Sequence, residues 1–173
     1  ETGLGYLAVA LTAVVASGVS QALVTRAGVK PILAIGMVLL GGGLAYFTQV
    51  SVDGSYVGDL LPGFLLIGVG LGFSIAALAG VTGKDAGLAS GLINTSQQIG
   101  GALGLAVLAT VSTTRTENLL ADGKDPATAL TSGFQIAFWV GVGLAAASLV
   151  ATLVALRKKD LEHVPGEAVP VPA

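Results

Sequence analysis

The chain has 173 residues, of which 53% are hydrophobic and only 10% are charged, and its mean hydropathy is +0.86. Soluble domains are about a quarter charged, so this composition excludes an ordinary water-soluble globule. The net charge of −2 gives no support to nucleic-acid binding, and the absence of cysteine excludes disulfides, thiolate metal sites and thiol nucleophiles.

Five uncharged runs follow one another along the chain, separated by short charged clusters. A hydrocarbon core of about 30 Å requires about 20 apolar residues in helical form, because every backbone N–H and C=O must be paired within the segment. We therefore predict an all-α fold, a polytopic transmembrane bundle of about five helices over residues 1–160. The predicted spans are approximately 4–25, 31–51, 60–81, 86–111 and 133–156. Residues 161–173 contain three prolines and predict a disordered cytoplasmic tail.

The basic residues are divided unequally between the two sides of the predicted membrane. Six of the eight follow the first, third or fifth span, and the other two follow the fourth. The six are Arg26, Lys30, Lys84, Arg157, Lys158 and Lys159, and the two are Arg115 and Lys124. Because cytoplasmic loops carry the excess of Lys and Arg, we expect a multi-pass protein of the plasma membrane with Glu1 outside and the C-terminus in the cytoplasm.

The first span has a small, polar face, whereas the second does not. Ser17 and Gln21 share one side of the first helix with Ala13, while Leu11 and Val15 turn away. The second span is polar only near its outer end, so we expect it to face lipid.

Small residues in the third span predict close helix packing. Gly68 and Gly72 are spaced as a small-xxx-small pair, and Ser74 adds a polar group two residues later. A phosphate-binding loop is not favoured, because the lysine of that motif is absent.

The fourth span has the clearest division between two faces. One face is small and polar and consists of Gly87, Ser90, Gly91, Asn94, Gln97, Gln98, Gly101 and Gly104. Amides within a membrane are costly without partners, so they indicate either hydrogen bonds to another helix or a water-filled substrate path. Both readings stay open. The predicted substrate-path residues are Asn94, Gln97, Gln98, Ser17, Gln21 and Ser74, and the predicted helix-packing glycines are Gly68, Gly72, Gly87, Gly91, Gly100, Gly101 and Gly104.

The fifth span lacks such a face and, like the second, is expected to face lipid. Phe134, Phe138 and Trp139 cluster near its outer end and predict aromatic anchors at the membrane interface.

No Asp, Glu, Lys, Arg or His lies within any of the five predicted spans. The single histidine, His163, lies in the tail, and the loop acids Asp53, Asp59 and Asp85 are expected to be solvated. A metal centre, a catalytic pair or triad, and a cofactor site within the membrane therefore have no residues to form them, and we predict that the chain is not an enzyme.

Four strings resemble the C-terminal part of a major facilitator superfamily transporter, and most closely its fourteen-helix drug/proton antiporter branch. They are VDGSY at 52–56, DLLPG at 59–63, DAGLASGLINTS at 85–96 and GGALGLA at 100–106. The resemblance implies that the five spans are the last five of a twelve-helix core. It also implies that Arg26, Gly28 and Lys30 form a cytoplasmic gating loop, that the first, third and fourth spans line the cavity or the domain interface, and that the other two are peripheral.

The function implied is proton-coupled efflux of drugs or other small molecules by alternating access. Its implied partners are the lipid bilayer, a small-molecule substrate, protons and the missing N-terminal half, since the chain begins with Glu1 and reads as a piece of a longer protein. The alternative is a non-transporting membrane scaffold or subunit that docks partner helices. Two features depart from the family: Gln97 stands where arginine is frequent, and the third span is short between Ser74 and Ile75.

Overall fold

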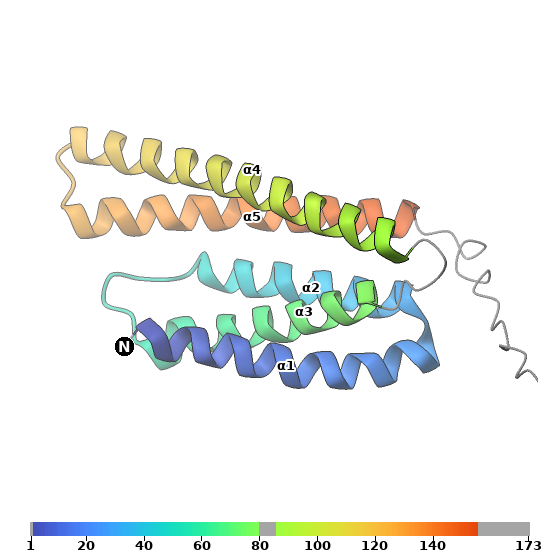
Figure 1. Ribbon diagram of the computed structural model, residues 1–173. Helices are drawn as coiled ribbons and strands as arrows, with labels where there is room; N and C mark the ends of the chain where they lie inside the picture. The colour runs from blue at the N-terminus through green and yellow to red at the C-terminus, as the bar shows by residue number, and fades with distance from the viewer. Residues whose placement is uncertain (1, 80–85, 156–173) are drawn as a thin grey trace, which may run out of the picture.

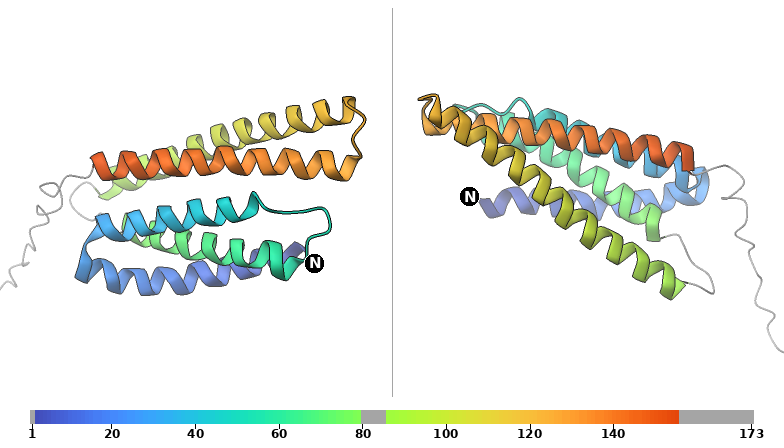
Figure 2. Two further views of the ribbon diagram at one scale, coloured as in Figure 1. Left: turned by 180° about the vertical axis from the view of Figure 1, so that it is seen from behind. Right: turned by 90° about the horizontal axis from the view of Figure 1, so that it is seen from above.

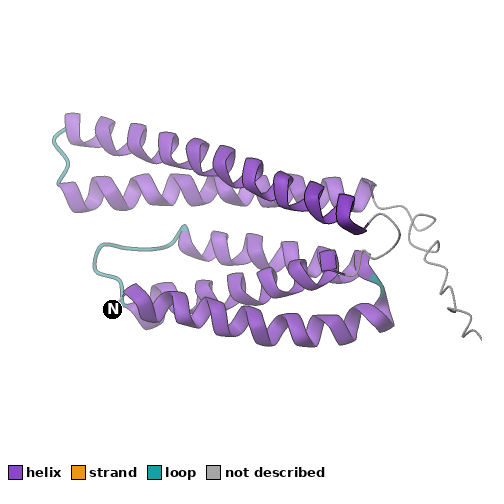
Figure 3. Cartoon of the chain, in the orientation of Figure 1, coloured by secondary structure: helices purple, strands orange, loops and turns teal. Residues whose placement is uncertain are grey.

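The computed structural model describes residues 2–79 and 86–155, and within these ranges it consists of helices, turns and loops without a strand (Figure 3). The α-helices are α1 (Thr2–Ala27), α2 (Val29–Phe47), α3 (Leu61–Ala79), α4 (Ala86–Ala121) and α5 (Pro126–Ala155). A π-helix, η1 (Tyr56–Leu60), leads directly into α3. The predicted all-α bundle is confirmed.

Several helix ends differ from the predicted span limits. α2 ends at Phe47 rather than near 51, α4 continues to Ala121, well past 111, and α5 begins at Pro126 rather than 133. Apolar content set the predicted limits, whereas turn chemistry sets the helix ends, with Gly123 (φ 76°) between α4 and α5. The predicted residues 80–81 and the predicted tail, 161–173, lie outside the described residues.

The helices form two groups that meet at α2 and α5 (Figure 1). α4 and α5 are an antiparallel hairpin, and α3 packs between α1 and α2. We call the end with the turn between α1 and α2 the Gly28 end, and the end with the turn between α4 and α5 the Gly123 end. The 48–55 loop lies at the Gly123 end, and α5 finishes at the Gly28 end (Figure 1).

Glycines on opposite sides of α3 allow it to pack closely against both neighbours. Gly68 faces α1, where an added Cβ would lie 2.9 Å from the carbonyl oxygen of Val9. Gly70, about 200° further round the helix, faces α2, where an added Cβ would lie 2.7 Å from the carbonyl oxygen of Gly36. Close approach through small residues is a main source of helix association in lipid, and these contacts explain the glycine-rich sequence of α3.

α2 lies in the middle of the bundle, between α3 and α5. Its buried residues are Ile32, Leu33, Gly36, Gly43 and Phe47. The Phe47 ring packs against Phe64 of α3 and Phe138 of α5, with ring centroids 5.1 Å and 5.2 Å apart. The expectation that the second span faces lipid is therefore wrong, because its glycines and terminal phenylalanine receive helices on two sides.

α5 meets the lipid-facing expectation only on one side. Phe134 and Trp139 are 55% and 57% exposed, as suits aromatic anchors at a membrane interface. Phe138 instead packs on Phe47, because α5 turns this side toward α2.

Four helices of the described residues are long and apolar enough to cross a membrane. The apolar segments are Leu7–Ala27, Val29–Phe47, Tyr56–Ile75 and Pro126–Val154. α4 is not among them, because Asn94, Gln97 and Gln98 lower its mean hydropathy. Yet α4 starts at the Gly28 end and finishes at the Gly123 end, so it connects α3 and α5 across the same thickness (Figure 1). A membrane crossing by α4 stays a prediction.

Candidate functional site

The polar face of α4 is the most unusual surface of the bundle. Asn94, Gln97 and Gln98 are exposed, and within the described part of the chain none of their amides has a hydrogen-bonding partner. The glycines along α4 are equally open: an added Cβ would meet nothing within 4 Å at Gly87, Gly91, Gly100, Gly101 or Gly104. The first part of α4 therefore presents three amides and a smooth glycine surface on which none of α1, α2 and α3 packs closely.

Leucines on the other side of this half of α4 are exposed as well. Leu88, Leu92 and Leu103 are 68%, 60% and 62% exposed. The right-hand view of Figure 2 shows the reason, because α4 separates from α5 toward its first residue. One side of this segment suits lipid, and the other needs a polar or closely packed neighbour.

The six predicted substrate-path residues do not form one cluster in the described chain. Ser17 is half-buried, and its hydroxyl donates to the carbonyl oxygen of Val14 in its own helix at 2.8 Å. Gln21 is exposed on α1, and α1 and α4 are not packed against each other. Ser74 donates to the carbonyl oxygen of Gly70 at 2.9 Å and lies beside α2. The structure thus separates the amides of α4 from the polar groups of α1 and α3.

The predicted packing glycines divide into two sets. Gly68 and Gly72 lie against α1, the first beside Thr12 and the second beside Ala13 and Ala16. The glycines of α4 meet none of the described helices, and their role in packing stays a prediction. α3 runs without interruption through Ser74 and Ile75, where the resemblance predicted a shortened span.

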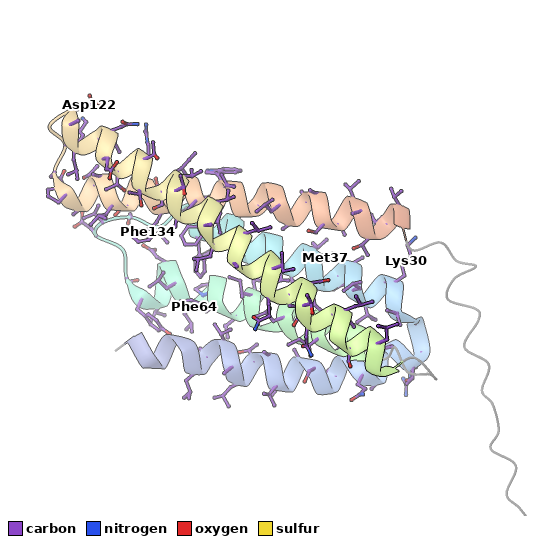
Figure 4. All side chains as sticks on the ribbon, turned by 45° about the horizontal axis from the view of Figure 1, so that its top comes forward. Lys30, Met37, Phe64, Asp122 and Phe134 are labelled. Carbon is purple, nitrogen blue, oxygen red and sulfur yellow. The ribbon has the colours of Figure 1, made fainter. Side chains whose placement is uncertain are left out.

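The predicted gating loop is a tight turn at the Gly28 end. Gly28 has a φ of 85°, and its N–H donates to the carbonyl oxygen of Val24 at 2.9 Å. Such a φ favours glycine, so the residue type follows from the turn. Arg26 is exposed, whereas the Nζ of Lys30 donates to the carbonyl oxygen of Leu153 at 2.9 Å, beside the last turn of α5 (Figure 4). A cation at a helix C-terminus is stabilised by the helix dipole, so Lys30 connects α2 to α5.

Polar contacts also fix the Gly123 end. Gln135 of α5 donates through Nε2 to the carbonyl oxygen of Val50 at 2.7 Å. Asp125 caps α5, since its carboxylate accepts a hydrogen bond from the N–H of Thr128 at 2.9 Å. This hydrogen bond lowers the pKa of the Asp125 carboxyl from its ordinary value of 3.8.

α4 and α5 meet most closely around Gly133. An added Cβ there would collide with the hydroxyl of Thr116 and lie 2.7 Å from the carbonyl oxygen of Ser112. The Thr116 hydroxyl is buried, and its one hydrogen is shared between the carbonyl oxygens of Ser112 at 2.9 Å and Ala129 at 3.4 Å, the second of which lies on α5. We call the contact of Ser112, Thr116 and Gly133 the α4 anchor.

Sequence reasoning missed the α4 anchor and the central position of α2. The central position of α2 could have been found from a spacing of seven residues, which is about two helical turns. Gly36 and Gly43 of α2 have this spacing, and they face Gly70 and Gly63 of α3, which have it too. Gly133 stands alone among larger residues and gave no comparable signal.

The described residues contain no group of three His, Cys, Asp or Glu side chains that could hold a metal ion. Asp59 lies in η1, where its Oδ2 accepts a hydrogen bond from Ser51 at 3.4 Å, and this pair belongs to the folding of the loop. The fold and its apolar helices define a multi-pass helical membrane protein.

The sequence of the chain is similar to those of several known proteins. The chain is 35% identical to the puromycin resistance protein of Streptomyces alboniger, over 99% of this chain and 37% of that relative. It is 37% identical to the cephamycin export protein of Amycolatopsis lactamdurans, over 65% of this chain and 24% of that relative. It is also 34% identical to the lincomycin resistance protein of Streptomyces lincolnensis, over 64% of this chain and 24% of that relative. No family model and no solved structure matches the chain.

The chain spans little more than a third of the first of these relatives and about a quarter of the other two. It is therefore similar to one part of proteins that are named for drug resistance or export.

Proposed function

We propose that this chain is the C-terminal part of a major facilitator superfamily transporter, of the fourteen-helix drug/proton antiporter branch, that exports drugs or other small molecules. The observation that carries the proposal is the 35% identity to a puromycin resistance protein over 99% of the chain. Further support comes from relatives named for the export of chemically different compounds.

The proposed transporter lies in the plasma membrane with the Gly28 end in the cytoplasm and the Gly123 end outside. The support is the positive-inside rule, because Arg26 and Lys30 belong to the Gly28 end and six of the eight basic residues fall on that side of the predicted spans. In this orientation Arg26, Gly28 and Lys30 form part of the proposed cytoplasmic gating loop.

The polar face of α4 is the proposed meeting surface with the remaining half of the transporter. Its three amides are costly in lipid without partners, and its four open glycines, Gly87, Gly91, Gly101 and Gly104, allow another helix to approach closely. Alternating access would then expose Asn94, Gln97 and Gln98 to the substrate as the two halves rock about a site near the bilayer midplane. Gln21, Ser17 and Ser74 are proposed to border the same path from α1 and α3.

Proton coupling is proposed to depend on groups outside this chain. The predicted spans contain no Asp, Glu or His, so a proton pathway requires acids elsewhere in the transporter.

Transport by the full-length protein that contains this chain tests the proposal. Puromycin, lincomycin and a cephamycin should each be tried in vesicles with an imposed pH gradient. We expect accumulation of at least one compound that stops when a protonophore collapses the gradient. Vesicles without protein provide the background.

The other outcomes separate the alternatives. Transport that persists without a proton gradient would retain the exporter and reject the coupling. No transport of any tested drug, by protein whose melting transition shows that it is folded, would reject the exporter in favour of the scaffold reading.

A further inference from the structure

The two arms of the α4–α5 hairpin are attached to the bundle very differently. α5 is held on α2 at several levels, through Phe138 at Phe47, through Gly141 at Leu44, and through Lys30 at the final turn. The hydroxyl of Thr152 also donates to the sulfur of Met37 at 3.2 Å. α5 is therefore fixed along its length.

α4 packs on α5 along its second half, where the partly covered residues run from Gly104 to Leu119 and the buried residue Thr116 lies in the α4 anchor. There Thr116 is buried, Ala129 is fully buried and Gly133 leaves no room for a side chain. Toward the Gly28 end residues on different sides of α4, such as Gln98 and Leu92, are both exposed, and Figure 2 shows the two helices separating. An attachment at one end fixes the direction of the whole helix.

From this asymmetry we infer that Thr116 and Gly133 are positioning residues: their contact sets the direction of α4 and hence where Asn94, Gln97 and Gln98 lie. The role of those amides in transport rests on the proposed function, whereas the contact between Thr116 and Gly133 does not. The contact at Gly133 cannot accommodate a larger side chain, because the nearest atom of Ser112 belongs to the backbone and cannot rotate away. Added bulk at Gly133 must tilt α4 or separate it from α5.

Labelling of a buried position inside the contact tests the geometry. Ala129→Cys, made in the full-length protein after any cysteine outside these 173 residues has been replaced, places a single thiol in the α4–α5 interface, since the 173 residues include no cysteine. In detergent we expect this thiol to react slowly with a hydrophilic maleimide and about tenfold faster when Gly133→Leu is added, because overpacking opens the interface. Leu130→Cys, at a half-exposed neighbour, gives the rate of an open site.

Gly143→Leu is the matched control. Gly143 lies on the same helix, but an added Cβ there would meet nothing within 4 Å. We expect Gly143→Leu to leave the Ala129→Cys rate unchanged. Thr116→Val, which removes the hydroxyl and keeps the volume, should raise the rate by a smaller factor and covers the case in which Gly133→Leu fails to fold.

Transport kinetics test the positioning role separately from stability. Gly133→Ala should raise the KM for the exported drug severalfold while the maximal rate per folded molecule stays within about twofold. Simple loss of folded protein would lower the maximal rate and leave the KM unchanged.

The outcomes are distinguishable. The inference would be overturned if the Ala129→Cys thiol reacted at the same rate alone, with Gly133→Leu added and with Thr116→Val added. It would also be overturned if Gly133→Leu and Gly143→Leu changed that rate equally. An unchanged KM in Gly133→Ala would also overturn it. Wild-type protein that transports no drug would reject the proposed function, while the labelling result would still decide whether the contact holds α4.

Discussion

Gly70 is a position where one added methyl group should weaken the contact between α2 and α3. In Gly70→Ala the new Cβ would lie 2.7 Å from the carbonyl oxygen of Gly36 and 2.8 Å from both the Cγ and the backbone nitrogen of Leu40. Favourable carbon contacts begin at about 3.5 Å, so α2 and α3 must separate by roughly 0.7 Å. Two of the three atoms are backbone and cannot rotate away. Overpacking of this kind costs about 1–3 kcal/mol.

The assay is thermal unfolding of the purified full-length protein in detergent, followed by far-ultraviolet circular dichroism. We expect Gly70→Ala to lower the midpoint by about 2–10 °C, scaling from the cost per kcal/mol in domains of this size. Gly42→Ala is the control, since an added Cβ on this α2 residue meets nothing within 4 Å. If both variants unfold within about 1 °C of the wild type, the close contact between α2 and α3 does not exist.

Three further predictions concern the two ends of the bundle and the face of α4. Because the pKa of Asp125 is lower in the folded protein than its ordinary 3.8, its cap stabilises α5 fully above that value and is lost as the pH falls through the lowered pKa. Asp125→Ala should therefore unfold more easily than the wild type at neutral pH, and the difference in midpoint should vanish in acid; a constant difference would contradict the cap. Lys30→Met should lower the free energy of unfolding by about 1 kcal/mol, measured by chemical denaturation against the exposed control Arg26→Gln, and equal values would remove the link to α5. Gln97→Cys in membranes should react with a hydrophilic maleimide and Leu103→Cys should not; reaction at Leu103 alone would reverse the assignment of faces.

The sequence was sufficient for the helices but not for their neighbours. Length, apolar content and the positions of charged clusters predict five helices, because backbone groups in lipid must be paired within each segment. They do not say which helix lies in the middle. α2 has little polar character, and its central position follows from Gly36, Gly43 and Phe47, which act only together with their partners on α3 and α5.

The sequence predicted which side of α4 carries the polar residues of the candidate site, but not which other helices lie near that side. The helical period put Asn94, Gln97 and Gln98 on one side of α4, and the structure has all three exposed. Which polar groups of other helices meet them depends on the direction of α4. We infer that this direction is set by Thr116, later in α4, and by Gly133 of α5. A single glycine among larger residues has no periodic pattern, so the sequence did not indicate this contact.

The α4–α5 hairpin is longer than a bilayer is thick. At 1.5 Å per residue, α4 with 36 residues extends about 54 Å and α5 with 30 residues about 45 Å, against roughly 30 Å of hydrocarbon. Gln135 is level with Val50, just past the end of α2, so the surplus length of α5 lies before Gln135. The turn at Gly123 therefore lies at the protruding end of the hairpin, where an inserted epitope or a bound antibody fragment would add the bulk that helps imaging of a membrane protein by electron microscopy.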